Sequence, residues 1–125
     1  MQDWKEVEER IQKLDSKHRG ILKCFGEDRR DILSNDGQTI TMDVGDKTVQ
    51  RKSITYNMIQ YAYDRLRGGC FFDSIYFCKH YQTEWNKGPC IFSMTGGILV
   101  ELKLADRHQK DGRSCFYVSG KGRWY

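Results

Sequence analysis

Residues 55–118 constrain the fold more than any other stretch, because start and stop signals divide them into short elements. Thr55 is a good helix N-cap, since its hydroxyl can accept a hydrogen bond from a free N–H group of the first turn. Gly68-Gly69 then supplies a stop for this helix. Asp73, another capping residue, predicts a second helix that runs on to Trp85.

Residues 90–105 admit two interpretations. Pro89 suits the first position of a third helix, and winding the segment as a helix gathers one apolar face, made by Ile91, Met94, Thr95, Ile98, Leu102 and Ala105. From Gly97 onward, however, apolar and polar residues also alternate as in a strand. Gly96-Gly97 favours a break, because each glycine costs about 1 kcal/mol inside a helix. We predict a helix, because the start at Pro89 has a physical mechanism, and keep an inner strand as the alternative.

The N-terminus predicts a helix over residues 3–17. Trp4, Val7, Ile11 and Leu14 follow one another at spacings of three, four and three, which places them on one stripe. We expect this stripe to pack on the chain's own domain. The same spacing is that of a coiled-coil seam, so a homodimer through these four residues is the alternative.

Between this helix and residue 52 the sequence predicts a small antiparallel meander. Asn35-Asp36-Gly37 is a tight-turn signal, because these residue types tolerate positive φ. The strand after this turn alternates apolar and polar residues, with Ile40 and Met42 on the apolar side. We therefore expect an α+β fold in one domain of 125 residues, in which residues 1–52 form the helix and meander and residues 53–125 form the helical part with a basic tail.

Composition excludes several classes of protein. There is no run of about 18 apolar residues and no charged-then-apolar leader, so no membrane span is expected. Five cysteines, an odd number without a leader, suit reduced thiols, and the expected location is the cytoplasm.

The positive charge is concentrated at the C-terminal end. The formal net charge is +4, and residues 1–52 contribute nothing to it, with 11 Lys and Arg against 11 Asp and Glu. The last 19 residues alone carry +4, from Arg107, Lys110, Arg113, Lys121 and Arg123 against Asp111. A local field of this sign attracts phosphates and gives salt-dependent binding, although a solvated basic tail has the same composition.

Three helices followed by a basic hairpin, which turns at residues 110–113 and closes at residues 113–118, resemble the winged helix-turn-helix family. The resemblance covers residues 53–118 and is one of architecture. In that family the third helix lies in the major groove and the hairpin wing touches the DNA backbone. The resemblance implies a nucleic-acid-binding surface, with double-stranded DNA as partner, made by Ser93, Gly96, Gly97, Lys103, Arg107, Lys110 and Arg113, to which the tail adds Lys121 and Arg123. The third helix offers no Arg, Asn or Gln on this side, so we expect contacts to phosphates and to DNA shape.

The sequence is compatible with two other functions. A protein-interaction or inhibitor module would dock a nucleic-acid-handling protein through Val100, Gly96-Gly97 and the basic wing. A nuclease of the PD-(D/E)xK type would use Glu101 and Lys103 on a strand with Asp73 as a further acid, since such sites hold Mg²⁺ on clustered carboxylates.

We expect neither a catalytic centre nor a metal or other cofactor. The residue types for zinc, which are Cys70, Cys78, His80 and Cys90, lack the close pairs of a structural site. A non-enzymatic DNA-binding protein is therefore the function that the sequence favours.

Overall fold

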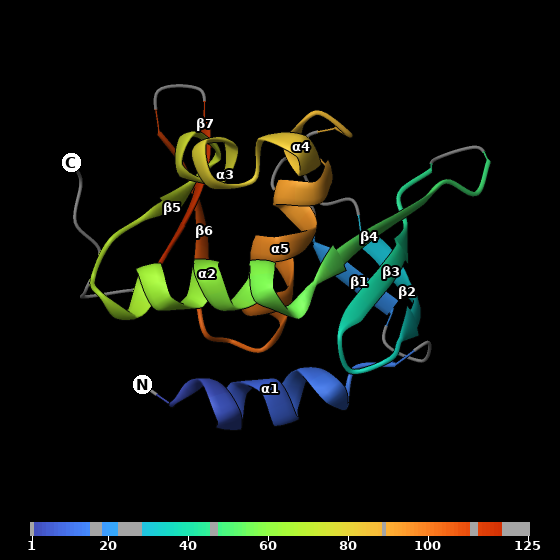
Figure 1. Ribbon diagram of the computed structural model, residues 1–125, viewed down its shortest axis with the longest axis horizontal. Helices are drawn as coiled ribbons and strands as arrows, with labels where there is room; N and C mark the ends of the chain where they lie inside the picture. The colour runs from blue at the N-terminus through green and yellow to red at the C-terminus, as the bar shows by residue number, and fades with distance from the viewer. Residues whose placement is uncertain are drawn as a thin grey trace.

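The computed structural model describes residues 2–15, 19–22, 29–45, 48–88, 90–110 and 113–118 (Figure 1). Within these ranges the chain is a mixed α+β protein with five helices and seven strands in two antiparallel sheets. In chain order the elements are α1 (Trp4–Gln12), β1 (Arg19–Leu22), β2 (Arg29–Asn35), β3 (Thr39–Asp43), β4 (Arg51–Thr55), α2 (Tyr56–Arg67), β5 (Phe72–Asp73), α3 (Ser74–His80), α4 (Gln82–Trp85), α5 (Cys90–Glu101), β6 (Asp106–Lys110) and β7 (Arg113–Tyr117). None of the helices in the described part of the chain is long and apolar enough to cross a bilayer.

Helix α1 begins at an N-cap, because the Asp3 carboxylate accepts from the backbone N–H of Glu6 at 2.9 Å. Its apolar stripe lies against the rest of the chain: Val7 and Ile11 are fully buried, and Leu14 is nearly so. The expectation that the stripe packs on its own domain is confirmed. Trp4 is partly buried against the same core, and the alternative, a homodimer through Trp4, Val7, Ile11 and Leu14, stays a prediction.

Strands β1 to β4 form the meander, with neighbours in the order β1-β2-β3-β4. Alternation along β3 sends Ile40 and Met42 to the inner face, where both are fully buried. At the β2–β3 turn Gly37 has a φ of +89°, a conformation that glycine adopts without strain. The Asp36 carboxylate accepts from the N–H groups of Gln38 and Thr39, and these hydrogen bonds hold the pKa of Asp36 below its ordinary value.

Asn35 joins three elements at the end of β2. Its side-chain amide donates to the carbonyl oxygens of Ile11, in the last turn of α1, and of Leu14, just beyond the helix, at 2.8 and 2.6 Å. Its side-chain oxygen accepts from the Tyr56 hydroxyl, at the first residue of α2, at 2.5 Å. One polar side chain therefore fixes α1, the meander and α2 relative to one another.

Helix α2 has the limits that the sequence predicts. The Thr55 hydroxyl accepts from the backbone N–H of Met58 at 3.3 Å, and the helix ends at Gly68, followed by Gly69 at a φ of +84°. Its buried residues are Tyr56, Met58, Ile59, Ala62, Tyr63 and Leu66.

The predicted helix from Asp73 to Trp85 is two helices. Asp73 caps α3 as expected, accepting from the N–H of Tyr76 at 3.1 Å. The backbone then leaves the helical region at Tyr81, with φ −127° and ψ 55°, and α4 starts at the next residue. The break lets the Tyr81 ring pack on α2, where its hydroxyl donates to the carbonyl of Asn57.

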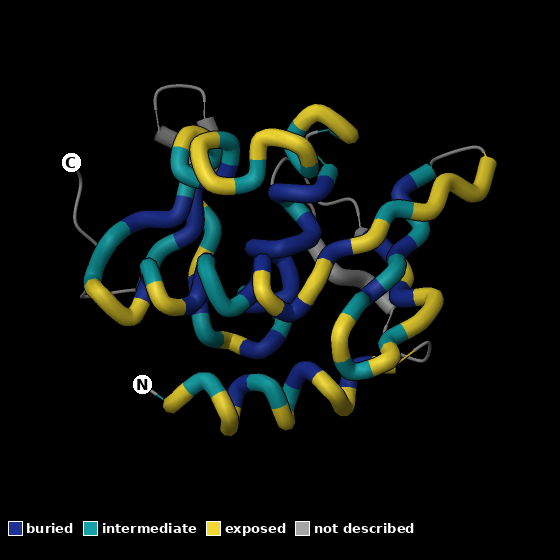
Figure 2. The backbone as a smooth tube through the Cα atoms, in the orientation of Figure 1, coloured by how far each residue is buried: buried dark blue, intermediate teal, exposed yellow. Residues whose placement is uncertain are grey.

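Helix α5 occupies most of the segment for which the sequence left two interpretations, so the helix is confirmed and the inner strand is wrong. It contacts β1 and β4 of the meander and also α2. Figure 2 shows this helix as almost entirely buried, and its buried residues are Ile91, Phe92, Met94, Thr95, Gly96, Gly97, Ile98 and Leu99. Helix α5 is apolar on all sides. It therefore belongs to the core that residues 1–52 and residues 53–125 share.

Candidate nucleic-acid interface

The basic hairpin predicted by the sequence is present as β6 and β7. The two strands pair antiparallel from Asp106↔Tyr117 to Lys110↔Arg113, and β5 joins the other side of β7 in the order β5-β7-β6. The hairpin is tied to the core because Phe116 is almost fully buried among the aromatic rings of Phe72 and Phe92.

Two cationic residues are partners in the register at the end of this hairpin. Lys110 pairs with Arg113 at the last position of the β6–β7 register. Arg107 lies three residues earlier on β6 and is half-buried. The two strands of the hairpin thus carry three cationic residues.

Helix α3 lies beside this hairpin. It contacts β7, and Figure 1 shows it at the same end of the molecule as the Lys110–Arg113 pair, opposite to α1. Lys79 and His80 close α3, and both are exposed. Lys79 therefore adds a positive charge on a helix beside the hairpin.

The structure corrects the prediction that one side of α5 faces DNA. Gly96 and Gly97 are buried, and Ser93 is half-buried, so these residues do not form an open surface. A Cβ at Gly96 would lie 2.0 to 2.3 Å from ring carbons of Phe116. Glycine is needed here for close packing between a helix and β7, and the same burial removes Gly96 and Gly97 from the docking surface of the alternative protein-interaction module.

Lys103 lies just beyond α5 in a strained conformation. Its φ is +60°, and the N–H groups of Lys103 and Leu104 donate to the carbonyls of Val100 and Leu99, the pattern of a Schellman helix end. Glycine usually occupies this position, because a Cβ is disfavoured in the left-handed region. The lysine is exposed, as the sequence expectation requires of a phosphate contact.

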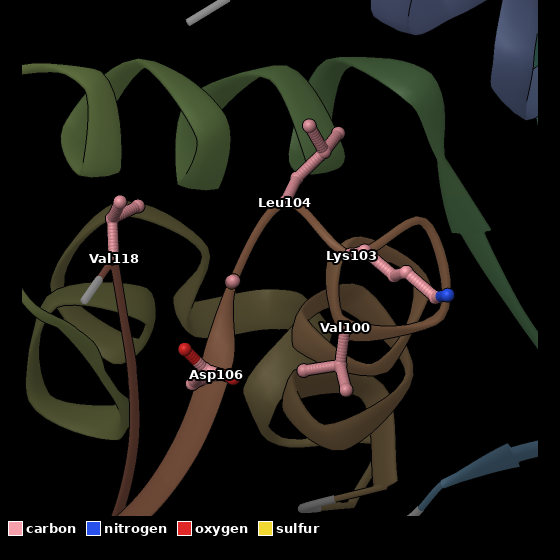
Figure 3. A pocket seen from close by; sticks show the side chains of 6 residues that line it. Val100, Lys103, Leu104, Asp106 and Val118 are labelled. Carbon is pink, nitrogen blue, oxygen red and sulfur yellow. The ribbon is translucent and has the colours of Figure 1, made fainter.

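A shallow hollow of about 430 Å³ lies next to Lys103 (Figure 3). It is lined by Val100, Lys103, Leu104, Ala105, Asp106 and Val118. Figure 3 shows the ammonium group of Lys103 extending to the side away from Asp106 and Val118. Charge therefore does not converge in the hollow, and nothing there selects a ligand.

The nuclease alternative lacks its geometry. Glu101 is the last residue of α5 and Lys103 lies in the turn after it, so the Glu-x-Lys pair is not on a strand. The Asp73 carboxylate serves as the cap of α3. In the part of the chain that the structure describes, no three His, Cys, Asp or Glu residues gather in a way that could hold a metal ion.

The cysteines of the described ranges carry free thiols. They are Cys70, Cys78, Cys90 and Cys115. The Cys78 thiol donates to the side-chain oxygen of Gln82 at 3.2 Å, an ordinary structural contact along the helix surface.

Sequence reasoning missed a cluster of rings and cations on α2 and α3. The rings of Tyr61 and His80 are stacked, with centroids 4.2 Å apart and planes 9° from parallel. The Arg65 guanidinium lies over the Tyr76 ring, 3.2 Å from its centroid. The available signal was spacing: Tyr61 and Arg65 are four residues apart on α2, and hence on one face.

Tyr61 of this cluster and its neighbour Tyr81 are neutral at physiological pH. Burial raises the pKa of the Tyr61 and Tyr81 phenols above their ordinary value of 10.0. The charges beside these rings are therefore those of the cations Arg65 and Lys79 and of the carboxylates of Asp73 and Glu84.

No protein-family model, curated protein or solved structure matches this chain. Its function is therefore inferred from its own geometry and charge. Lys121 and Arg123, which the sequence adds to the basic surface, lie outside the described residues.

Proposed function

We propose that this protein is a non-enzymatic nucleic-acid-binding module of the winged-helix type, which holds the phosphate backbone of DNA with its β6–β7 hairpin. The order of elements supports the proposal: α2, α3, the short α4 and α5 are followed by a basic antiparallel hairpin. This is the order in which a winged helix-turn-helix presents its helices and wing. The observation that carries the proposal is the pairing of Lys110 with Arg113 at the projecting end of the hairpin.

The mode of binding differs from that of a protein that reads the major groove with its third helix. Helix α5 is covered by the meander, so it cannot enter a groove without losing its core contacts. Backbone contacts through the hairpin remain, and they position a protein on DNA without reading its sequence. The proposed activity is therefore weakly sequence-specific and strongly dependent on salt.

Fluorescence anisotropy with a labelled DNA duplex over a salt series tests the proposal. Contacts from Lys110 and Arg113 to two phosphates predict a plot of log K against log salt with a slope of about −2. The double variant Lys110→Ala/Arg113→Ala should reduce the magnitude of that slope by about 2, and should weaken binding equally for duplexes of different sequence.

Lys13→Ala is the matched control, because Lys13 is exposed and follows α1 at the opposite end of the molecule (Figure 1). It should leave the slope unchanged. A wild-type protein that does not bind the duplex at low salt overturns the proposal, and so does an equal loss of binding in the control and the hairpin variant.

A further inference from the structure

We infer that the surface of α2 and α3 beside the hairpin is a stacking site for unpaired bases of a single-stranded nucleic acid. The inference rests on the proposed function and extends it, since it adds a site that takes bases to a hairpin that takes phosphates. Its centre is the Tyr61–His80 stack, and its rim is made by Arg65, Tyr76 and Lys79.

The His80 ring is held in a fixed orientation by two neighbouring rings. On one side it stacks on Tyr61 at 4.2 Å, and the Tyr81 ring meets it edge-on at 4.8 Å and 72°. Tyr61 is supported in turn by an edge contact with the fully buried Phe72 at 6.2 Å and 76°. His80 itself is exposed at the end of this series of rings. A base placed on the imidazole would extend an existing stack, and little freedom would be lost because the protein rings are already ordered.

The second part of the site pairs a ring with cations. Arg65 is anchored by a hydrogen bond from its Nε to the carbonyl of Phe71 at 2.7 Å, and its guanidinium lies over Tyr76. The Lys79 ammonium is 5.6 Å from the centroid of the same ring. Helix α3 contains no acidic residue, and the carboxylate of its cap, Asp73, accepts from a backbone N–H. Rings interleaved with cations match the alternation of bases and phosphates along a single strand.

The site fits an unpaired strand and not a duplex. In a duplex the flat faces of the bases are covered by their neighbours, so an exposed ring on a protein surface cannot stack on them without disrupting the helix. Because α3 contacts β7 and lies at the Lys110–Arg113 end of the hairpin, one strand could run from the hairpin cations to the rings of α3 (Figure 1).

Anisotropy titrations with three labelled probes test the inference: an oligothymidylate of about 12 nucleotides, an abasic strand with the same number of phosphates, and a DNA duplex. The wild type should bind oligothymidylate at least about fivefold more tightly than the abasic strand, because only the former has bases to stack. His80→Ala should remove that difference while leaving the affinities for the abasic strand and the duplex unchanged.

Two further variants separate stacking from charge and from folding. His80→Phe keeps a flat ring and should retain the preference for oligothymidylate. Lys79→Ala should weaken binding of the thymidylate and abasic strands alike. Thermal melts should show that all three variants are folded, as expected for side chains that are exposed.

The outcomes distinguish the two proposals. Salt-dependent duplex binding with no preference for oligothymidylate over the abasic strand overturns the stacking site and leaves the hairpin proposal standing. Equal losses of the preference in His80→Ala and His80→Phe also overturn the stacking site. A wild-type protein that binds none of the probes overturns both.

Discussion

Helices α3 and α5 lie in the same half of the chain, yet they have opposite relations to solvent (Figure 2). Eight of the twelve residues of α5 are buried, because β1 and β4 of the meander cover one side of it and α2 covers another. In α3 only Phe77 is buried, and Lys79 and His80 face outward. The helix that the family resemblance assigns to DNA is thus core, and the short helix before it carries the open surface. The difference comes from the N-terminal meander, more than 30 residues earlier in the chain.

The largest expected effect is a loss of stability when a side chain is added to the buried helix, α5. Gly96→Val should lower the free energy of unfolding by about 3 kcal/mol, because the added side chain would overlap the Phe116 ring. Urea denaturation measures the loss. Gly68→Ala is the control: its Cβ would meet only the carbonyl oxygens of Arg65 and Asp64, at 3.4 and 3.6 Å, so stability should change by less than about 1 kcal/mol. A Gly96→Val protein as stable as wild type would mean that α5 is not packed against β7.

A smaller effect is expected at the polar joint between α1, the meander and α2. Asn35→Ala removes both hydrogen bonds to α1 and the one from Tyr56, and should cost about 2 kcal/mol of stability. Asn57→Ala, at an exposed position of α2, should change stability by less than about 0.5 kcal/mol. DNA binding should be the same in both variants, because the joint is far from α3 and the hairpin (Figure 1). Weaker DNA binding in Asn35→Ala alone would show that the joint at Asn35 is coupled to the surface of α3 and the hairpin.

The smallest expected effect is an increase in stability. Lys103→Gly should raise stability by about 1 kcal/mol, because glycine adopts the +60° φ of this position without strain. Lys103→Ala keeps a Cβ and should give no such gain. Both variants remove the ammonium group, so an equal weakening of duplex binding in the two would assign a phosphate contact to Lys103, as the sequence predicts. Equal melting temperatures for the two would argue against strain at this residue.

The sequence predicts best what depends on local chemistry. The caps at Thr55 and Asp73, the stop at Gly68 and the turn after Asn35 are all found, because each requires only a side chain and the backbone groups near it. The basic hairpin is found for the same reason, since its two strands are neighbours in the sequence.

Contacts between distant segments could not be predicted. Gly96-Gly97 indicated an open helix face, but whether small residues admit DNA or another part of the protein depends on what lies opposite, here Phe116. The break at Tyr81 depends on the ring contacts of that tyrosine with α2. The Tyr61–His80 stack joins residues 19 apart, beyond any helical spacing. These features arise from tertiary packing, which the hydrophobic pattern leaves open.

The position of α5 also determines the order in which the protein can fold during synthesis on the ribosome. The inner face of the meander, with Ile40, Met42 and Ile54, is synthesised well before the helix that covers it. Until residue 101 has left the exit tunnel, this face and the paired strands around it lack their main apolar partner. A nascent chain is therefore most prone to aggregation late in synthesis, and a fragment truncated before residue 90 should need a chaperone to stay in solution.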